Sequence, residues 1–511
     1  MLWTFIKSLV SKEAMPPPGA QGGALAKGVA RLNAGDLVAA CRYLDDALKA
    51  DPDDSVAAYY LGLAQAQSGR LESALTLLES SRVRHDSAEV NNALGNVRRL
   101  RGELQPAAAH YRHALEIDEN HLPALANLGL TLRDLGAPAE SLTVLDRAIR
   151  IAPAHVETLF NQALAWNDLG KTGTAEKLIE QALSLDPAFA QAHLQRAFSL
   201  LKRRDFSNGW REYAWRVRIP EVDHWQDYPY PLWQGEALAG KRLLVQAEQG
   251  LGDQIMFASC LAEVIEKAEH VVIECDPRLA KLFARSFPRA KVYRHRVAGE
   301  PDWSHEAAPD FRARCGDPPR FLRVDDTSFP LHDGYLVPDP TRVKVWRHQL
   351  DALGAGPKIG ISWRGGTPAT GQSIRSIALE SLLPILGARA AHFVSLQYGN
   401  VSGEVSAFTA RHNIAVHELA SADGDLDGVA ALIASLDVVI TVCTTAAHLA
   451  GALGKRTLVL VPAVAEWRYL AAGPSIPWYP SLRLFRQQRL HEWDDVISQV
   501  ARELGAPLKP Q

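Results

Sequence analysis

Small residues recur at an almost constant interval along the first two fifths of this 511-residue chain. They stand at Gly28, Gly62, Gly95, Gly129, Ala163 and Ala197, with successive gaps of 34, 33, 34, 34 and 34 residues. A fixed period of this length indicates stacked copies of one small unit, because each copy is too short to bury a core by itself. The first part of the chain is therefore expected to form a continuous helical array.

A second set of small residues follows the first, twelve positions later, and a larger apolar residue follows four positions after that. The small ones are Ala40, Ala74, Ala107, Ser141 and Ala175, and the larger ones are Leu44, Leu78, Tyr111, Leu145 and Ile179. Small residues let two helices approach closely while larger ones fill the space beside them. This pattern resembles the tetratricopeptide repeat, and residues 21–205 are predicted to hold five repeats and a degenerate sixth.

The resemblance implies a right-handed superhelix whose concave surface binds a protein partner. The alternative is an array with a purely structural role.

Composition and charge exclude several other classes of protein. The apolar fraction of 47% and the charged fraction of 22% are those of a globular chain, and a net charge of −3 gives no field that would draw it to nucleic acid. Five cysteines lack the spacing of a zinc site, and no apolar run is long enough to cross a membrane. The N-terminal segment 1–20 is too short in its apolar part for a secretory signal. We therefore predict a cytoplasmic protein with no nucleic-acid partner, no transmembrane segment and no metal.

An aromatic connector follows the array at residues 206–240, GWREYAWRVRIPEVDHWQDYPYPLWQGE forming most of it. A flexible linker would be rich in Gly and Ser and poor in aromatic residues. This segment is therefore expected to pack.

From residue 241 the sequence changes to short β-branched runs that alternate with helical stretches, as in parallel βαβ units. Residues 241–340 are predicted to form a first Rossmann-like lobe, and residues 341–485 a second. A Pro/Asp-rich stretch around 325–342 separates them as a hinge. The fold class is thus α + α/β, with a ligand cleft at the carboxyl ends of both sheets. The C-terminal helix within 486–511 is expected to cross back to the first lobe.

The turn EQGLGD joins the first strand of the first lobe to a helix. Gly250 and Gly252 allow a tight turn and leave backbone N–H groups open to an anion or a sugar. Asp253 is either a general base at the mouth of the cleft or an N-terminal cap of the helix, and Glu248 is the reserve candidate for the base.

In the second lobe a strand runs directly into an alanine-rich helix at DVVITVCTTAAHLAGALG. Thr444 and Thr445 can offer hydroxyl and amide groups to a diphosphate at the helix N-terminus, and His448 lies one turn further on the same face. The alternative is that the threonines cap the helix and the histidine packs in the helix–sheet interface.

Three more polar residues follow strand ends or a loop in this lobe. Arg364 and Arg375 are candidates to neutralise phosphate, although surface ion pairs would explain both. Gln397 could contact a base or ribose, or could be a turn residue. The DGD of SADGDLDG precedes an amphipathic helix and is interpreted as a helix cap rather than a metal motif.

The segments EQGLGD, ISWRGG, SLQYG, VCTTAAHLAGALG, EWRYL and WYPSLRLFRQ, in this order, resemble bacterial tetratricopeptide-repeat proteins with a C-terminal glycosyltransferase domain. The catalytic part of that family is similar to the lipopolysaccharide heptosyltransferases. The resemblance implies a GT-B fold, a metal-independent inverting transfer and a nucleotide sugar as donor substrate, with no permanently bound cofactor. It makes the first lobe, 241–340, the acceptor side and the second lobe, 341–485, the nucleotide-sugar side. It places Asp253 at the catalytic aspartate, Thr444, Thr445 and His448 at the donor phosphates, and Arg364 near a basic donor-binding residue.

Cys443 departs from the family pattern, which has an aspartate at this position. A thiol is no charged acceptor unless it is ionised, so either the donor sugar is not a heptose or the activity is weakened.

The leading hypothesis is a glycosyltransferase that modifies Ser or Thr of a protein recruited by the array, as in flagellin-type O-glycosylation. The alternatives are a non-enzymatic scaffold with a degenerate α/β part and a transferase that acts on a glycan or lipid-linked acceptor.

Overall fold

The computed structural model describes residues 23–219, 227–296, 299–366, 372–387, 390–419 and 424–505. The predicted N-terminal segment 1–20 and Trp225 of the connector lie outside this part. The chain divides into two compact units, Met1–Ala192 with Ile219–Glu221, and His193–Arg218 with Val222–Gln511. Each unit is described by itself.

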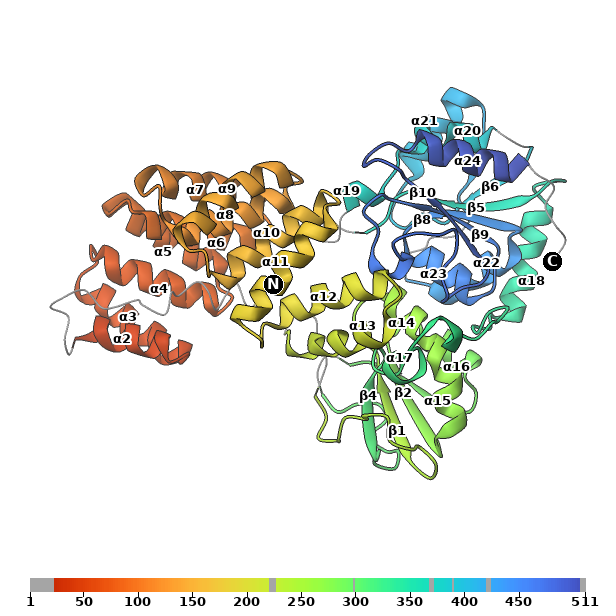
Figure 1. The fold of residues 1–511 in the computed structure, drawn as a ribbon, viewed down its shortest axis with the longest axis horizontal. Helices are drawn as coiled ribbons and strands as arrows, with labels where there is room; N and C mark the ends of the chain where they lie inside the picture. Colours follow the sequence, from red (N-terminus) through yellow and green to blue (C-terminus); the bar gives the residue numbers. More distant parts are fainter. Residues whose placement is uncertain are drawn as a thin grey trace. The chain divides into compact units, whose positions relative to one another are not determined.

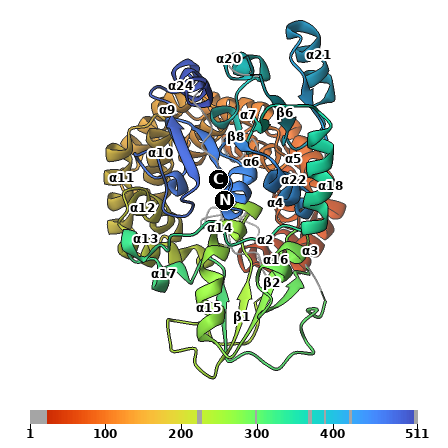
Figure 2. The same cartoon turned by 90° about the vertical axis from the view of Figure 1, so that its right-hand side faces the viewer.

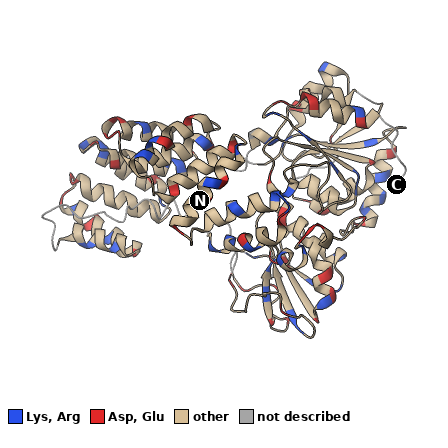
Figure 3. Cartoon of the chain, in the orientation of Figure 1, with Lys and Arg blue, Asp and Glu red and all other residues tan. Residues whose placement is uncertain are grey.

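The first unit is a series of helical hairpins (Figure 1). Their helices are α2 (Ala24–Asn33) and α3 (Leu37–Ala50), α4 (Ser55–Gln67) and α5 (Leu71–Arg84), α6 (Ala88–Leu100) and α7 (Leu104–Ile117), α8 (Leu122–Asp134) and α9 (Pro138–Ile151), and α10 (Val156–Asp168) and α11 (Thr172–Leu185). Basic and acidic residues are interspersed on these helices (Figure 3). The predicted five repeats are present at the predicted spacing.

The recurring glycines allow the two helices of each hairpin to touch. A Cβ atom at Gly129 would lie 2.5 Å from Cγ of Leu145, and one at Gly95 would lie 2.5 Å from the ring of Tyr111. Real Cβ atoms do not approach other atoms so closely, so a side chain at these positions would force the helices apart. The prediction that the small residues mark close helix contacts is confirmed.

The turn inside each of these hairpins uses a left-handed residue. Gly35, Gly69, Gly102, Gly136 and Gly170 have φ between 73° and 81°. A sixth hairpin follows, made of α12 (Ala190–Lys202) and α13 (Phe206–Tyr213), and there Arg204 takes the equivalent turn position with φ 67°. A non-glycine residue costs about 1 kcal/mol or more in this conformation. The sixth repeat was expected to depart from the pattern of the others, and its turn does so by having Arg204 in place of glycine. Its second helix lies beyond residue 205, inside the predicted connector.

The second unit contains two parallel sheets among its described residues. The first-lobe sheet has the order β3-β2-β1-β4, from β1 (Arg242–Gln246), β2 (His270–Cys275), β3 (Lys291–Arg294) and β4 (Phe311–Arg314). The accompanying helical segments are η1 (Ala214–Arg218), α14 (Leu251–Phe257), η2 (Ala258–Cys260), α15 (Leu261–Lys267), α16 (Ala280–Ser286), α17 (Pro319–Leu322) and η3 (Asp326–Ser328). Figure 2 shows α15 and α16 beside β1 and β2.

The second-lobe sheet has the order β10-β9-β8-β5-β6-β7, again fully parallel. Its strands are β5 (Lys358–Ser362), β6 (His392–Ser395), β7 (Val416–His417), β8 (Val438–Val442), β9 (Thr457–Val461) and β10 (Leu482–Arg486). Its helical segments are α18 (Pro340–Asp351), α19 (Gln372–Arg375), η5 (Leu379–Leu382), α20 (Leu383–Leu386), α21 (Ser402–His412), α22 (Leu426–Ser435), α23 (Thr445–Ala452), η6 (Trp467–Tyr469) and α24 (Asp494–Gly505). Counted from β5, this is the Rossmann order 3-2-1-4-5-6, whose strand order reverses between β5 and β8.

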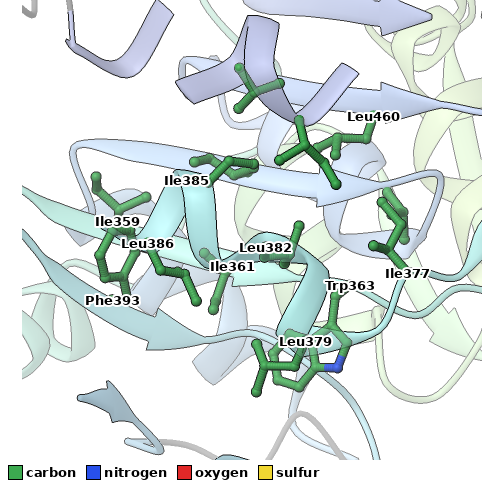
Figure 4. Packing of buried hydrophobic residues seen from close by; sticks show 14 of the residues in the cluster. Ile359, Ile361, Trp363, Ile377, Leu379, Leu382, Ile385, Leu386, Phe393 and Leu460 are labelled. Carbon is green, nitrogen blue, oxygen red and sulfur yellow. The ribbon is translucent and has the colours of Figure 1, made fainter. Parts of the chain in front are cut away.

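The C-terminal helix α24 belongs to the second lobe, which corrects the expectation that it crosses to the first. Val496, Ile497, Val500 and Leu504 are buried in one apolar cluster with residues such as Ile359. Figure 4 draws part of this cluster, with side chains from the strands and from the segment after Ile377 close together. The apolar side of α24 therefore packs against the sheet of its own lobe.

Aromatic residues of the predicted connector pack within the second unit. The ring of Trp210 on α13 makes edge contacts with the rings of Phe257, Trp467 and Trp478, at centroid distances of 6.4, 5.6 and 6.0 Å. Its Nε1 donates to the carbonyl of Arg323 at 2.8 Å. The expectation that this segment packs is confirmed for its described residues.

We predict that Gly129→Ala destabilises the array by about 1–3 kcal/mol, because the added methyl group overlaps Leu145. Urea unfolding of the full chain, followed by far-UV circular dichroism, measures the loss. Gly173→Ala is the matched control, since a Cβ there meets nothing within 4 Å. Equal stability of the two variants would contradict the close-contact interpretation.

Candidate functional site

A pocket of about 740 Å³ opens at the carboxyl ends of both sheets of the second unit. It is lined by residues of the segments that follow β1, β2, β5, β6, β7, β8 and β9. Of the residues singled out from the sequence, it brings together Gly250, Gly252, Asp253, Arg375, Cys443, Thr444, Thr445 and His448. Its volume lies within the usual range for small-molecule sites, roughly 300–1,000 Å³.

Asp253 lies in the first turn of α14 and serves there as a cap. Its Oδ2 accepts the N–H of Gly250 at 3.3 Å, which confirms the predicted capping role of this carboxylate. Asp253 also lines the pocket, and its Oδ1 accepts from Nε of Arg468 at 2.8 Å and from Nη2 of the same side chain. The turn before it holds Gln249 at φ 59°, a conformation that non-glycine residues adopt at a cost and that clusters at functional sites.

A chain of alternating charges runs from Asp253 through the second lobe. Arg468 donates from Nη1 to Oε2 of Glu466 at 3.1 Å, and Arg375 pairs with Oε1 of the same carboxylate at 2.6 Å. Burial would lower the pKa of Arg468, but Asp253 and Glu466 raise it well above its usual range. Arg468 therefore stays charged and satisfies two carboxylates at once.

Sequence reasoning assigned no role to Arg468 or Glu466. Both stand in the quoted EWRYL segment, just after strand β9. Their position could have identified them, because charged residues that follow the carboxyl end of a buried strand were the pattern that singled out the other candidates. Arg278 and Tyr398, which also line the pocket, follow β2 and β6 in the same way.

The N-terminus of α23 forms another wall of the pocket. Thr444 caps this helix, since its Oγ1 accepts the N–H of Ala446 at 3.2 Å. A Cβ atom on Gly365 would lie 2.8 Å from the Cys443 carbonyl, so the loops after β5 and β8 touch at the point where the strand order reverses. Helix N-termini at such points attract anions, because their N–H groups and dipole face the ligand.

His448 lies on α23 beneath this wall and is neutral. Burial, and then the charge of Arg468, lower the pKa of His448 to about 3. Its Nδ1 is 3.1 Å from the hydroxyl of Tyr479, and a Cβ on Gly252 would lie 2.9 Å from its ring. A neutral imidazole can act toward a ligand only through hydrogen bonding. The ring is buried, but it contacts Gly252 of α14 and Tyr479, neither of which is in a strand, and it lines the pocket, so these contacts do not support the helix–sheet interface alternative.

Cys443 is also neutral and buried. Burial, and then the charge of Glu466, raise the pKa of its thiol well above the usual range. Its Sγ lies 3.8 Å from the carbonyl of Leu460. The thiol is therefore uncharged at the position where the family that the sequence resembles has an aspartate.

Glu248, the reserve candidate for a base, does not line the pocket. Its carboxylate is fully buried and pairs with Arg216 at 2.6 and 2.9 Å, and it accepts the N–H of Gly316 at 2.9 Å. Arg216 in turn pairs with Asp317 at 2.7 Å. This cluster joins the segments that follow the adjacent strands β1 and β4, so Glu248 stabilises the first lobe there.

Gln397 and Arg364 are likewise outside the pocket lining. Oε1 of Gln397 accepts the backbone N–H groups of Trp363 and Arg364 at 3.0 and 2.8 Å, so this amide holds the loop after β5. The guanidinium of Arg364 pairs with Glu404 at 2.5 Å, which is the ion-pair alternative. Both residues shape the loop without facing the ligand space.

The described residues contain no group of three or more His, Cys, Asp or Glu side chains placed to hold a metal ion. Asp425, in the DGD segment, caps α22 by accepting the N–H of Gly428 at 3.1 Å, so the cap prediction is confirmed for this residue. No described helix has both the length and the apolar character needed to cross a membrane.

Comparison with known proteins identifies the repeats. Two family models of the tetratricopeptide repeat match residues 31–97 and 126–190. Protein FlbA of Caulobacter vibrioides is 31% identical over 496 residues, which cover 93% of this chain and 83% of FlbA.

Two solved structures of helical-repeat proteins each match about a third of the chain or slightly more. The crystal structure of the MamA protein shares 24% identity over 33% of this chain and 92% of its own, with a TM-score of 0.29. YrrB, described as a TPR protein with an unusual peptide-binding site, shares 18% identity over 38% of this chain and 97% of its own, with a TM-score of 0.29.

We predict that Glu248→Ala lowers the free energy of unfolding by about 3 kcal/mol, because it removes one carboxylate from a buried arginine. Chemical denaturation measures the change, with the exposed Glu266→Ala as the control. A loss no larger than that of the control would remove the structural role assigned to Glu248.

The neutral state of His448 predicts a stability that depends on pH. The unfolded chain takes up a proton near the ordinary pKa of 6.5, whereas the folded one resists until about 3, so folding is destabilised as pH falls below about 6.5. The slope from this residue is about 1.4 kcal/mol per pH unit at most.

Unfolding in urea at about pH 7.5 and about pH 5 measures this contribution as the difference between the wild type and His448→Gln. The variant is expected to lose less stability on acidification. Identical pH profiles would show that His448 is protonated normally in the folded protein.

Proposed function

The chain belongs to the family of protein FlbA, with which it aligns along both units, and we propose that it is a glycosyltransferase. It moves a sugar from a nucleotide-sugar donor to an acceptor recruited by the tetratricopeptide array. The favoured acceptor is a Ser or Thr hydroxyl of a protein, as in flagellin-type O-glycosylation. The transfer is metal-independent and inverts the anomeric carbon.

One observation carries this proposal, the pocket that two parallel sheets share at their carboxyl ends. Two Rossmann-like lobes that face one ligand space are the arrangement of the GT-B fold. Open parallel sheets bind ligands at this edge, and two sheets allow donor and acceptor to meet there. The sequence resemblance to the heptosyltransferases points to the same fold.

The donor diphosphate fits the second-lobe wall of the pocket. The N-terminus of α23 offers backbone N–H groups, and Arg375 and Arg468 supply positive charge nearby. Arginine suits this task because its planar fork binds phosphate oxygens in pairs. His448, being neutral, contributes at most a hydrogen bond.

Asp253 is the proposed general base. It accepts the proton of the acceptor hydroxyl while that oxygen forms a bond to the anomeric carbon, and the bond from this carbon to the diphosphate oxygen breaks. The leaving nucleoside diphosphate takes the electron pair and is stabilised by the arginines.

The contact between Asp253 and Arg468 must change during this step. In the structure, Arg468 donates from Nε to Oδ1 of Asp253 at 2.8 Å. A diphosphate competes for the same guanidinium, so donor binding frees Asp253 to accept a proton. Binding of the donor would then precede activation of the acceptor.

The neutral, buried Cys443 favours a second candidate, a scaffold in which the array binds a partner and the α/β part has lost catalysis. A transferase that acts on a glycan or lipid-linked acceptor is the other alternative. Donor binding separates the scaffold from both transferases, and the modified product separates the two transferases.

A thermal-shift screen over UDP, GDP, ADP and CMP sugars is the first test, followed by intact mass of candidate acceptor proteins. We expect one donor to stabilise the protein. With that donor, Asp253→Asn should lower the transfer rate by about 10²-fold or more while donor affinity stays equal or rises, because Arg468 is released.

The exposed Asp351→Asn is the matched control and should retain the wild-type rate. Absence of any donor shift would favour the scaffold. A transfer rate of Asp253→Asn equal to that of the control would exclude Asp253 as the base.

A further inference from the structure

A second cavity of about 350 Å³ lies at the carboxyl ends of β9 and β10 and shares no lining residue with the first pocket. Its lining consists of small and apolar residues together with Lys202, Arg486, Gln487 and Gln488. Lys202 is the last residue of α12, and the other three end or follow β10. All of them belong to the second unit.

The cavity carries two positive charges and its lining has no carboxylate. Burial, and then the charge of Arg486, lower the pKa of Lys202. Among the residues that the structure describes, no acidic side chain forms an ion pair with either cation. Two like charges held together without a counter-charge favour a bound anion.

The guanidinium of Arg486 is occupied by backbone carbonyls and not by an acid. It donates to Gly473 at 2.7 Å, to Leu470 at 3.2 Å, and also to Tyr469. These bonds fix the group at the cavity wall and leave its net charge in place. For Nζ of Lys202, in contrast, no hydrogen-bond acceptor is found among the residues that the structure describes.

Gln487 provides a third, independent sign of a ligand. Its side chain is 4% exposed, and its Oε1 accepts the N–H of Ala463 at 3.0 Å. Its Nε2 is buried and has no hydrogen-bond partner among the described residues. A buried donor without an acceptor costs free energy, which a ligand oxygen would recover.

We propose that this cavity binds the phosphate-type oxyanion of a small molecule. The oxyanion accepts from Nζ of Lys202 and Nε2 of Gln487, and it neutralises the repulsion between Lys202 and Arg486. A volume of 350 Å³ leaves room for a sugar-sized body behind the anionic group. Free inorganic phosphate and a phosphorylated metabolite share this chemistry. The assignment does not depend on the proposed transferase activity.

The first test is protection of Lys202 from acylation in the full-length protein, read by peptide mass mapping. An amine with a lowered pKa reacts readily near neutral pH, and an anion that raises this pKa by one unit reduces the free amine about tenfold. Inorganic phosphate and glucose 6-phosphate are the probes, with sodium chloride at matched ionic strength as the blank. The exposed Lys344 is the internal control.

We expect the labelling rate of Lys202 to fall by about tenfold with at least one probe, while that of Lys344 stays unchanged. Stronger protection by glucose 6-phosphate would identify a phosphorylated molecule as the ligand, and equal protection would identify phosphate itself. An unchanged rate of Lys202 at tens of millimolar of both probes would overturn the proposal.

Calorimetric titration with the same probes provides a second measurement. Lys202→Met and Gln487→Leu should each weaken one binding event by about tenfold or more, whereas Lys344→Met should not. Phosphate that binds at the first pocket would still bind to the Lys202 variant. Binding at the two sites is therefore distinguished by comparing this variant with the wild type. Identical isotherms for Lys202→Met and the wild type would also overturn the proposal.

Discussion

The indole of Trp210 packs among rings that come from both lobes, and this cluster determines how the second unit is held together. Phe257 ends the helix that carries Asp253, and Trp467 precedes Arg468. Both rings contact Trp210, so the two charged residues of the pocket are anchored by neighbours in the same apolar cluster. Edge-to-face contacts of this kind are worth about 0.5–1.5 kcal/mol each beyond burial. The ion pair between Asp253 and Arg468 therefore depends on aromatic packing one residue or one turn away.

Each arginine that lines the pocket pairs with a carboxylate, Arg278 with Asp276 and the other two with Asp253 or Glu466. Asp253 and Glu466 alternate with Arg468 and Arg375, and His448 and Cys443 are both kept neutral by burial. An anionic ligand must therefore exchange partners with carboxylates rather than fill a vacant positive site. Such exchange favours ligands with several oxygens, because the free energy of a single new hydrogen bond to an arginine would not offset the loss of an existing ion pair.

The sequence predicted those features that periodicity or strand-end position encodes. The repeats, the two parallel sheets and the residues Asp253, Thr444 and His448 beside one pocket followed from such patterns. Glu248 was misplaced because the side-chain direction after β1 is set by Arg216, a partner 32 residues earlier that no local pattern reveals. The role of Arg468 was missed for the same reason, since its partner lies 215 residues away. The position of α24 was mispredicted because its amphipathic pattern shows that one side is buried but does not specify which of the two sheets that side packs against.

The sixth hairpin has a consequence for how such proteins can change in evolution. Its turn contains Arg204 in a conformation that the other hairpins reserve for glycine, and its second helix places Trp210 in the aromatic cluster. A hairpin inserted or deleted upstream of α12 would leave the residues of that cluster in the chain, whereas deletion of α13 would remove Trp210. Repeats before α12 can therefore be added or lost without loss of this cluster. The number of repeats can thus change while the residues that form the pocket stay the same.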